Sequence, residues 1–205
     1  MRRHTAVKTL VSCLANNDVA IFSGKDICKD AYKYDRPGNL YLNEELSPAP
    51  LALGVANGTN KRVFVFCEDS IFLRDISSLA QIAVSKCTNL FYVVLVTGIY
   101  SSTGTPTIFN EISAPKGVMF NMGFLVHNYT NLFKLPGIAK ELKAIWSKAR
   151  GPMTVFVDVT AHKVKGLVEV KQDLSAFREF VTDRTLGTSV YQPEYNLENM
   201  TLFGD

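Results

Sequence analysis

The sequence predicts one α/β domain in which helices cover both faces of a mainly parallel sheet. First, apolar runs with strand character alternate along the chain with segments that repeat apolar residues at helical spacing. Second, the strongest strand patterns, 62–67 and 90–96, are apolar at nearly every position, as expected for strands covered on both faces. We therefore expect a three-layer α/β/α domain of about six strands over residues 1–182 and an irregular tail over 183–205.

The first half of the chain alternates as this fold class requires. Apolar residues at positions 6, 7, 10, 11 and 14 predict a first helix over 5–14. A short buried strand is expected at 18–22, and Ser23-Gly24 marks a turn after it. The further elements of this half are expected in the order helix 26–32, a short strand after 35–39, helix 48–56 and strand 62–67.

The second half continues the alternation. A helix is expected over 71–85, with Ile76, Leu79, Ala80 and Ala83 on one side, and a strand over 90–96. Polar turn residues occupy much of 97–107, and the stretch around His127 is strand-like. The last elements are expected to be helix 136–149, which has Pro136 near its start, strand 153–159 and helix 174–181.

Composition excludes several functional classes. The net charge is +3 and the 22 basic residues are scattered, so the sequence predicts no nucleic-acid partner. The longest apolar run, 90–96, is far too short to span a membrane. The four cysteines show neither metal-ligand spacing nor a disulfide framework, which favours reduced thiols in a cytoplasmic protein.

Candidate functional residues follow the strands, because ligands of open parallel sheets bind beyond the carboxyl ends of the strands. Asp69 either binds a cation or serves as a carboxylate at a helix start. Residues 101–104 form either a phosphate-binding loop or an ordinary polar turn. No motif makes His127 or His162 catalytic, and we assign no catalytic residue.

Two motifs at these segments carry a family resemblance. Residues 63–70 read Val-Phe-Val-Phe-Cys-Glu-Asp-Ser, and Ser78-Leu79-Ala80 and Asn89-Leu90 follow them. Residues 97–104 then read Thr-Gly-Ile-Tyr-Ser-Ser-Thr-Gly. In order and spacing, roughly residues 3–181 resemble the β subunit of sulfopyruvate decarboxylase and the matching half of phosphonopyruvate decarboxylase. That family has Gly-Asp-Gly after the first strand and Asn-Gly-x-Tyr-x-Ser-Thr-Gly after the second.

The resemblance implies thiamine diphosphate and Mg²⁺ as cofactors, and it assigns roles to individual residues. Asp69 takes the place of the metal-binding aspartate, and Thr97 takes the place of a metal-binding asparagine. Ile99 would offer its backbone carbonyl to the metal. The implied contacts with the cofactor come from Glu45, Ser70, Ser101, Ser102, Thr103 and Gly104.

The sequence departs from the family at this same place. Glu68 and Ser70 replace the two glycines, and the loop that reads Gly-Ser-Met-Gly in the family is Asn43-Glu44-Glu45-Leu46. Two unit charges about 5 Å apart repel by roughly 3 kcal/mol at an effective dielectric of about 20. A carboxylate beside the diphosphate therefore predicts weakened cofactor binding.

Two functional hypotheses remain open. The first is the β-type subunit of a thiamine-diphosphate-dependent 2-oxo acid decarboxylase of the sulfopyruvate or phosphonopyruvate type, impaired in cofactor binding. Family catalysis needs a glutamate on a pyrimidine-binding half that this chain is too short to contain, so an α-type partner subunit is implied. The alternative is a non-catalytic structural or partner-binding protein that reuses the fold and its oligomer interfaces. A homo- or hetero-oligomer is expected in both cases.

Overall fold

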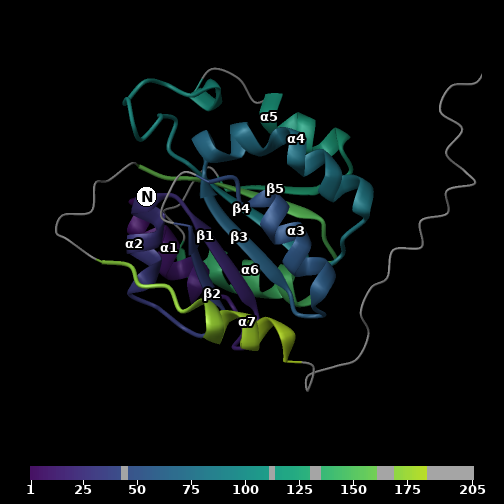
Figure 1. The fold of residues 1–205 in the computed structure, drawn as a ribbon. Helices are drawn as coiled ribbons and strands as arrows, with labels where there is room; N and C mark the ends of the chain where they lie inside the picture. Colours follow the sequence, from purple (N-terminus) through teal and green to yellow (C-terminus); the bar gives the residue numbers. More distant parts are fainter. Residues whose placement is uncertain (43–45, 111–113, 130–134, 161–168, 184–205) are drawn as a thin grey trace, which may run out of the picture.

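A computed structural model of the chain describes residues 1–42, 46–110, 114–129, 135–160 and 169–183. Within these residues six strands form one sheet in the order β2-β1-β3-β4-β6-β5, and every pair of neighbouring strands is parallel. Helices lie on both faces of the sheet (Figure 1). This arrangement confirms the predicted α/β fold class.

The elements alternate along the chain. The strands are β1 (Val19–Ser23), β2 (Asn39–Leu42), β3 (Val63–Glu68), β4 (Leu90–Val96), β5 (Leu125–Tyr129) and β6 (Met153–Asp158). The helices are α1 (Arg3–Val11), α2 (Lys25–Tyr32), α3 (Ala49–Gly58), α4 (Asp69–Ser85), the 3-10 helix η1 (Ile108–Asn110), α5 (Ala114–Asn121), α6 (Leu135–Lys148) and α7 (Leu174–Thr182).

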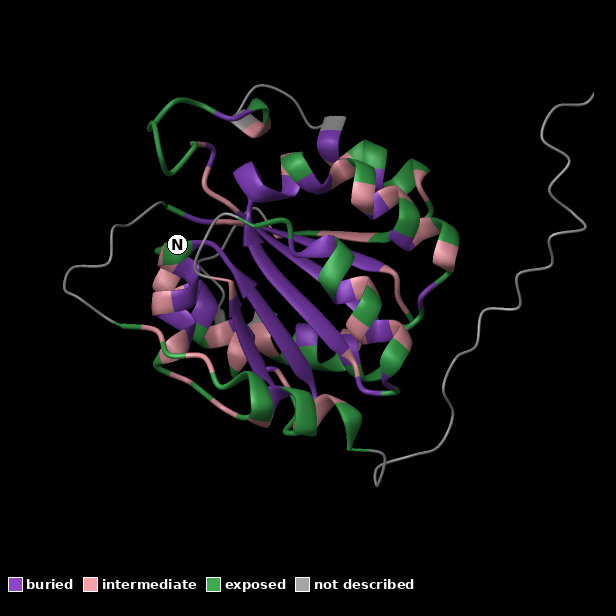
Figure 2. Cartoon of the chain, in the orientation of Figure 1, coloured by how far each residue is buried: buried purple, intermediate pink, exposed green. Residues whose placement is uncertain are grey.

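Two hydrophobic cores form, one on each face of the sheet. Helices α1, α2 and α6 contribute to the first, in which Trp146 packs 4.8 Å from the ring of Phe64. Helices α3, α4, α5 and α7 contribute to the second, in which Phe72 meets the rings of Tyr92 and Phe156 edge-on. The central strands β3 and β4 are consequently buried at every residue except Val96, the last of β4 (Figure 2), as their continuous apolar sequence predicts.

The chain reverses its direction of winding between β1 and β3. From β1 it passes through α2 to β2 on one side, and it then returns through α3 to β3 on the other side. Such a switch point opens a crevice at the carboxyl ends of the strands, where ligands of this fold class bind. Gly24 starts α2 with a φ of +107°, and a β-carbon there would lie 3.2 Å from Ile71 of α4. Glycine thus lets the starts of α2 and α4 approach each other.

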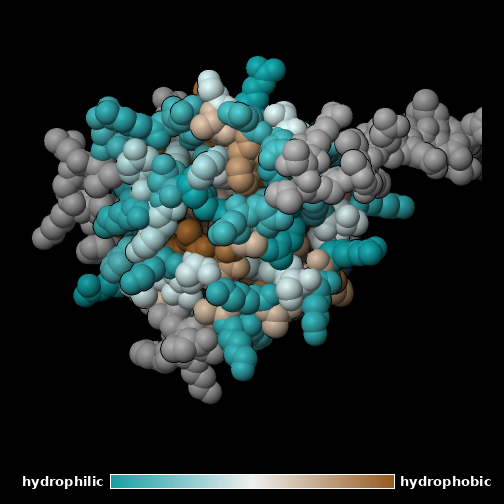
Figure 3. Space-filling model, turned by 90° about the horizontal axis from the view of Figure 1, so that it is seen from below, coloured by the Kyte–Doolittle hydropathy of each residue, from teal (hydrophilic) through white to brown (hydrophobic). Residues whose placement is uncertain are grey.

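The two outer strands are covered differently. The amide of Tyr41 in β2 donates to the side-chain oxygen of Gln172 (2.7 Å), and α7 packs beside this strand. Lys61 holds α7 in place with its ammonium 3.9 Å from the centre of the Phe180 ring. The side of the molecule beneath α7 is mainly hydrophilic, with a small hydrophobic area near its centre (Figure 3). Strand β5 forms the opposite edge.

Most predicted elements lie within a few residues of their observed bounds. The first helix differs, because it begins at Arg3 and ends at Val11, whereas 5–14 was predicted. Helix α5 was not predicted, and the strand-like stretch around His127 is strand β5. None of the helices in the described part of the chain is both long and apolar enough to cross a membrane.

Candidate functional site

The carboxylate of Asp69 joins the start of α4 to the loop after β4. Asp69 is the first residue of α4 and is fully buried. Its Oδ1 accepts hydrogen bonds from the amide (3.1 Å) and the hydroxyl (2.9 Å) of Thr97. Its Oδ2 accepts from the amide of Gly98 (3.1 Å) and the hydroxyl of Thr107 (2.6 Å). Asp69 and Thr97, both predicted metal ligands, are therefore in direct contact.

Four donors fill the capacity of this carboxylate, because two carboxylate oxygens offer about four lone-pair positions. The carbonyl oxygen of Ile99, the third predicted ligand, lies 3.1 Å from the Thr97 hydroxyl. This spacing matches the roughly 3 Å between neighbouring ligands of an octahedral Mg²⁺. The single hydroxyl proton of Thr97 nevertheless has its shorter contact with Asp69. The Thr97 hydroxyl is thus spaced from the other two oxygens as Mg²⁺ ligands are, but the lone pairs of Asp69 are already used by protein donors.

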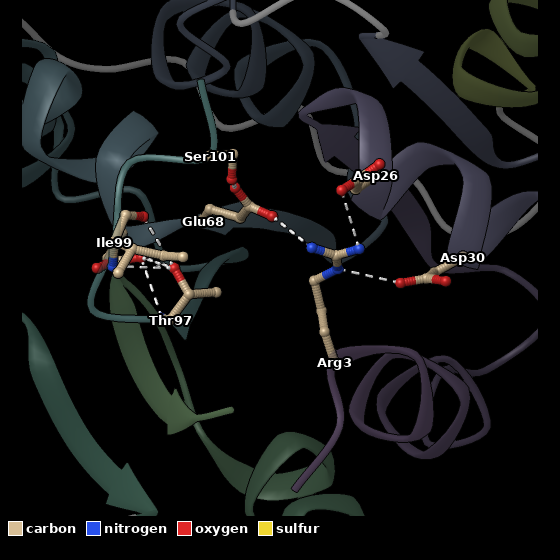
Figure 4. A network of polar contacts seen from close by, with 8 residues as sticks. Arg3, Asp26, Asp30, Glu68, Thr97, Ile99 and Ser101 are labelled. Atoms are coloured by element: carbon tan, nitrogen blue, oxygen red, sulfur yellow. Dashed lines mark hydrogen bonds and ion pairs between the residues drawn. The ribbon is translucent and has the colours of Figure 1, made fainter. Parts of the chain in front are cut away.

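A second polar cluster occupies the switch point between β1 and β3 (Figure 4). Glu68, the last residue of β3, forms an ion pair of 3.0 Å with Arg3 at the start of α1. Arg3 also pairs with two carboxylates of α2, Asp30 at 3.1 Å and Asp26 at 3.3 Å. Arg3, Asp30 and Glu68 are buried. One guanidinium thus joins α1, α2 and β3 where this fold class offers room for a ligand.

Burial raises the pKa of Glu68 above its ordinary value of 4.5, and the nearby charges of Asp26 and Asp69 add to the rise. The Ser101 hydroxyl, which donates to Glu68, and the guanidinium of Arg3 oppose this shift. The Glu68 carboxylate therefore contacts both the guanidinium of Arg3 and the hydroxyl of Ser101 (Figure 4).

The ion pair with Arg3 corrects the predicted repulsion between Glu68 and a diphosphate, because that prediction assumed a carboxylate without a cationic partner. Arg3 neutralises much of that charge, so the predicted effect of Glu68 alone is too large. Asp26 and Asp30 nevertheless make the cluster negative, because one guanidinium and three carboxylates give a formal charge of −2. A diphosphate, which is itself multiply negative, does not fit beside this cluster.

Residues 97–107 form a closed turn. Ile99 and Pro106 make an antiparallel bridge, and the carbonyl of Tyr100 accepts from the amides of Thr103 (3.3 Å) and Gly104 (2.7 Å). These amides bond within the turn and are not directed at a ligand. Of the predicted cofactor contacts here, Ser101, Ser102, Thr103 and Gly104 are all exposed. The geometry favours the polar-turn interpretation of 101–104.

Ser70 is the exception among the predicted cofactor residues. It lies in the first turn of α4, it is buried, and its hydroxyl has no hydrogen-bond partner among the described residues. It therefore has hydrogen-bonding capacity to spare. Glu45 lies outside the described residues, as does His162.

Cys67 and His127 take no part in this site. Cys67 lies in β3 and is fully buried, and burial raises the pKa of its thiol well above the ordinary value of 9.0. The thiol is therefore protonated and unreactive at neutral pH. His127 lies in β5 at the edge of the sheet.

Sequence reasoning missed Arg3, Asp26, Asp30 and Thr107, although these residues determine the chemistry of the site. One signal was available, because Asp26 and Asp30 are four residues apart on a predicted helix and so share a face. Two carboxylates on one face suggest a cation nearby. Nothing in the sequence points to Arg3 as that cation, since 65 positions separate it from Glu68.

Comparisons with known proteins agree with the fold. No family model matches the chain, and no curated protein matches it. Among solved structures, one described as a thiamin diphosphate-dependent enzyme from Mycobacterium smegmatis superimposes with a TM-score of 0.62 at 16% identity, over 79% of this chain and 32% of its own. Benzoylformate decarboxylase from Polynucleobacter necessarius gives 0.57 at 15% identity, over 78% and 33% of the two chains.

A third structure, 2-oxoglutarate:ferredoxin oxidoreductase from Magnetococcus marinus, gives a TM-score of 0.59 at 15% identity, over 77% of this chain and 60% of its own. The chain thus spans about a third of the first two proteins. Identities this low establish the fold alone. The chain has the fold of a domain that occurs in thiamine-diphosphate-dependent enzymes.

Proposed function

We propose that this chain is a non-catalytic domain that keeps the thiamine-diphosphate-binding fold and acts through contacts with other protein chains. The observation that carries the proposal is the saturated carboxylate of Asp69, whose four donors all come from the chain itself. A carboxylate in this state cross-links α4 to the loop after β4, and it has no lone pair left for a cation.

The cluster around Arg3 supports the same conclusion. Glu68 and Asp30 are buried there, and the three carboxylates outnumber the guanidinium. A site for a diphosphate needs an excess of positive charge or of free backbone amides. Here the amides of Thr97 and Gly98 donate to Asp69, and those of Thr103 and Gly104 donate to Tyr100.

A second candidate function is the β-type subunit of a thiamine-diphosphate-dependent 2-oxo acid decarboxylase. The Thr97 hydroxyl lies 2.9 Å from an Asp69 oxygen and 3.1 Å from the Ile99 carbonyl oxygen, and these distances and the unpartnered Ser70 hydroxyl favour it. In that case Asp69, Thr97 and Ile99 would hold Mg²⁺, and Ser70 would contact the diphosphate. An α-type partner would have to supply the pyrimidine-binding half.

Isothermal titration calorimetry of the full chain with thiamine diphosphate and Mg²⁺ tests the first candidate, which has no cofactor site. We expect no heat of binding at millimolar ligand. The triple variant Glu68→Gly, Ser70→Gly, Thr97→Asn serves as the comparison, because it restores the family residues at these positions and removes the Glu68 carboxylate. We expect this variant to bind at least tenfold more tightly than the wild type. Micromolar binding by the wild type would overturn the first candidate and favour the second.

A further inference from the structure

Strand β5 leaves one edge of the sheet open. Its inner side pairs with β6, and the amide of Leu125 donates to the carbonyl of Pro152 (3.0 Å). Because backbone groups alternate along a strand, Val126 and Asn128 direct their N–H and C=O groups outward. Among the described residues nothing pairs with that outer side, in contrast to β2, whose edge Gln172 and α7 cover.

Exposed apolar side chains lie on β5 and on the helix that packs against it. Phe120 is 70% exposed, Leu125 51% and Val118 37%. Phe120 and Val118 belong to α5, which packs against β5. The sequence contains no Asp, Glu, Lys or Arg from position 117 to position 133. Edge strands usually carry a lysine, a proline or a bulge that prevents pairing with other chains, and β5 has none of these devices.

We propose that β5 pairs with β5 of a second copy of this chain. Two copies related by a two-fold axis meet in antiparallel orientation, which aligns Val126 of each copy with Asn128 of the other if the axis passes through His127. Both outward N–H groups and both outward carbonyls of each strand then find partners, and four hydrogen bonds join the copies. The exposed Phe120 and Leu125 would flank this junction.

Charge and closure both favour a second copy as the occupant. An isologous interface brings the same patch of both copies together, so a charge near the two-fold axis would meet the same charge, and an uncharged stretch avoids this repulsion. Each copy has one open and one covered edge among its described residues. Pairing the two open edges therefore gives a finite dimer with a continuous sheet, and it leaves no edge for further growth.

The inference depends on the β5 edge alone, and it holds whether or not thiamine diphosphate binds. Sedimentation equilibrium of the full chain over a wide concentration range tests it. We expect a monomer–dimer equilibrium for the wild type. Val126→Pro removes the outward N–H of β5 in both copies, and with it two of the four inter-copy hydrogen bonds. We expect it to weaken association about tenfold or more.

Val126→Ala is the matched control, because it trims the same side chain and keeps the N–H group, and we expect it to dimerise. Phe120→Lys provides a second variant, in which two like charges face each other across the junction without disturbing a buried residue. We expect it to be monomeric. Val84→Lys, at a valine of α4 that is 80% exposed, should dimerise like the wild type.

Three results would overturn the proposal. The first is a wild type that stays monomeric at every concentration. The second is a dimer that Phe120→Lys leaves intact, since the contact would then lie elsewhere. The third is a dimer that Val126→Ala weakens as much as Val126→Pro does, since the backbone pairing would then be irrelevant. None of these results affects the calorimetric test of the proposed function.

Discussion

Two parts of the sheet differ in whether their polar groups have partners within the chain. These parts are the carboxyl ends of β3 and β4 and the outer side of β5. At the carboxyl ends, Asp69 is bonded to four donors of the chain, and Glu68 is bonded to Arg3 and Ser101. At β5, the outward backbone groups of Val126 and Asn128 have no partner among the described residues, and apolar side chains surround them. Apart from the Ser70 hydroxyl, the polar groups named at the place where this fold class binds ligands are bonded within the chain, whereas the edge at β5 has free backbone groups among the described residues.

This contrast indicates where binding free energy is available. A ligand at the carboxyl ends would first have to break existing hydrogen bonds and ion pairs, which offsets what it gains. A strand added at β5 gains hydrogen bonds and apolar contacts without breaking any that the described residues make. Three substitutions in the polar clusters at the carboxyl ends of the strands test this comparison.

The largest effect is expected for Arg3→Met. It removes the guanidinium that pairs with Glu68 and Asp30, and both carboxylates are buried. Removing one partner of a buried pair costs about 3–5 kcal/mol, because the remaining charge is uncompensated. We expect a loss of this size in the free energy of unfolding measured with urea. Arg2→Met is the control, because Arg2 is exposed, whereas Arg3 is buried. Equal stability of the two variants would mean that the cluster does not hold the fold together.

A smaller loss is expected for Asp69→Asn. The amide group keeps the size of the side chain, but it offers only one acceptor oxygen to four donors. Its NH₂ group is itself a donor and would face the donor groups of Thr97 or Gly98. We expect the free energy of unfolding to fall by about 3 kcal/mol. Asp173→Asn, at an exposed cap of α7 where both residue types serve equally well, should be neutral. If Asp69→Asn is neutral or stabilising, the hydrogen bonds of Asp69 do not stabilise the fold. The carboxylate would then be kept for a ligand, and the description of a site satisfied by the chain itself would be wrong.

The smallest effect is expected in the pH dependence of Glu68→Gln. The folded-state pKa of Glu68 is raised, so between the ordinary value of 4.5 and the folded pKa the folded chain binds more protons than the unfolded chain. The stability of the wild type then falls as pH rises through this window. The variant lacks this contribution, so the stability advantage of the wild type should shrink with rising pH above 4.5. Urea unfolding at several pH values measures it. An advantage that grows with pH would mean that Arg3 outweighs burial and lowers this pKa.

Periodicity in the sequence predicts those parts of the fold that depend on apolar burial. Strand 90–96 was predicted with its observed bounds, because every residue from Leu90 to Leu95 is buried. Helix α5 escaped prediction, since Gly117 and the surrounding apolar residues give Ala114–Asn121 no clear polar face. The first helix was predicted to start too late, because its first residue, Arg3, is buried through ion pairs that an apolar pattern does not reveal.

The site was predictable where the residues follow strands in a fixed order. The family resemblance grouped Asp69, Thr97 and Ile99, and these three residues do lie together. What the sequence could not provide is the protonation and pairing of these groups. Thr107 lies 38 positions after Asp69 in the sequence, and Arg3 lies 65 positions before Glu68. Such distant pairings depend on the topology of the whole sheet.

The Arg3–Glu68 ion pair also bears on the order in which the chain can assemble. Arg3 begins the first helix, yet its partner is 65 positions away and becomes available only when β3 has been made. Contacts between such distant positions form late, because a long loop must close before they contribute. On the ribosome, the Arg3–Glu68 ion pair therefore cannot form until β3 has emerged.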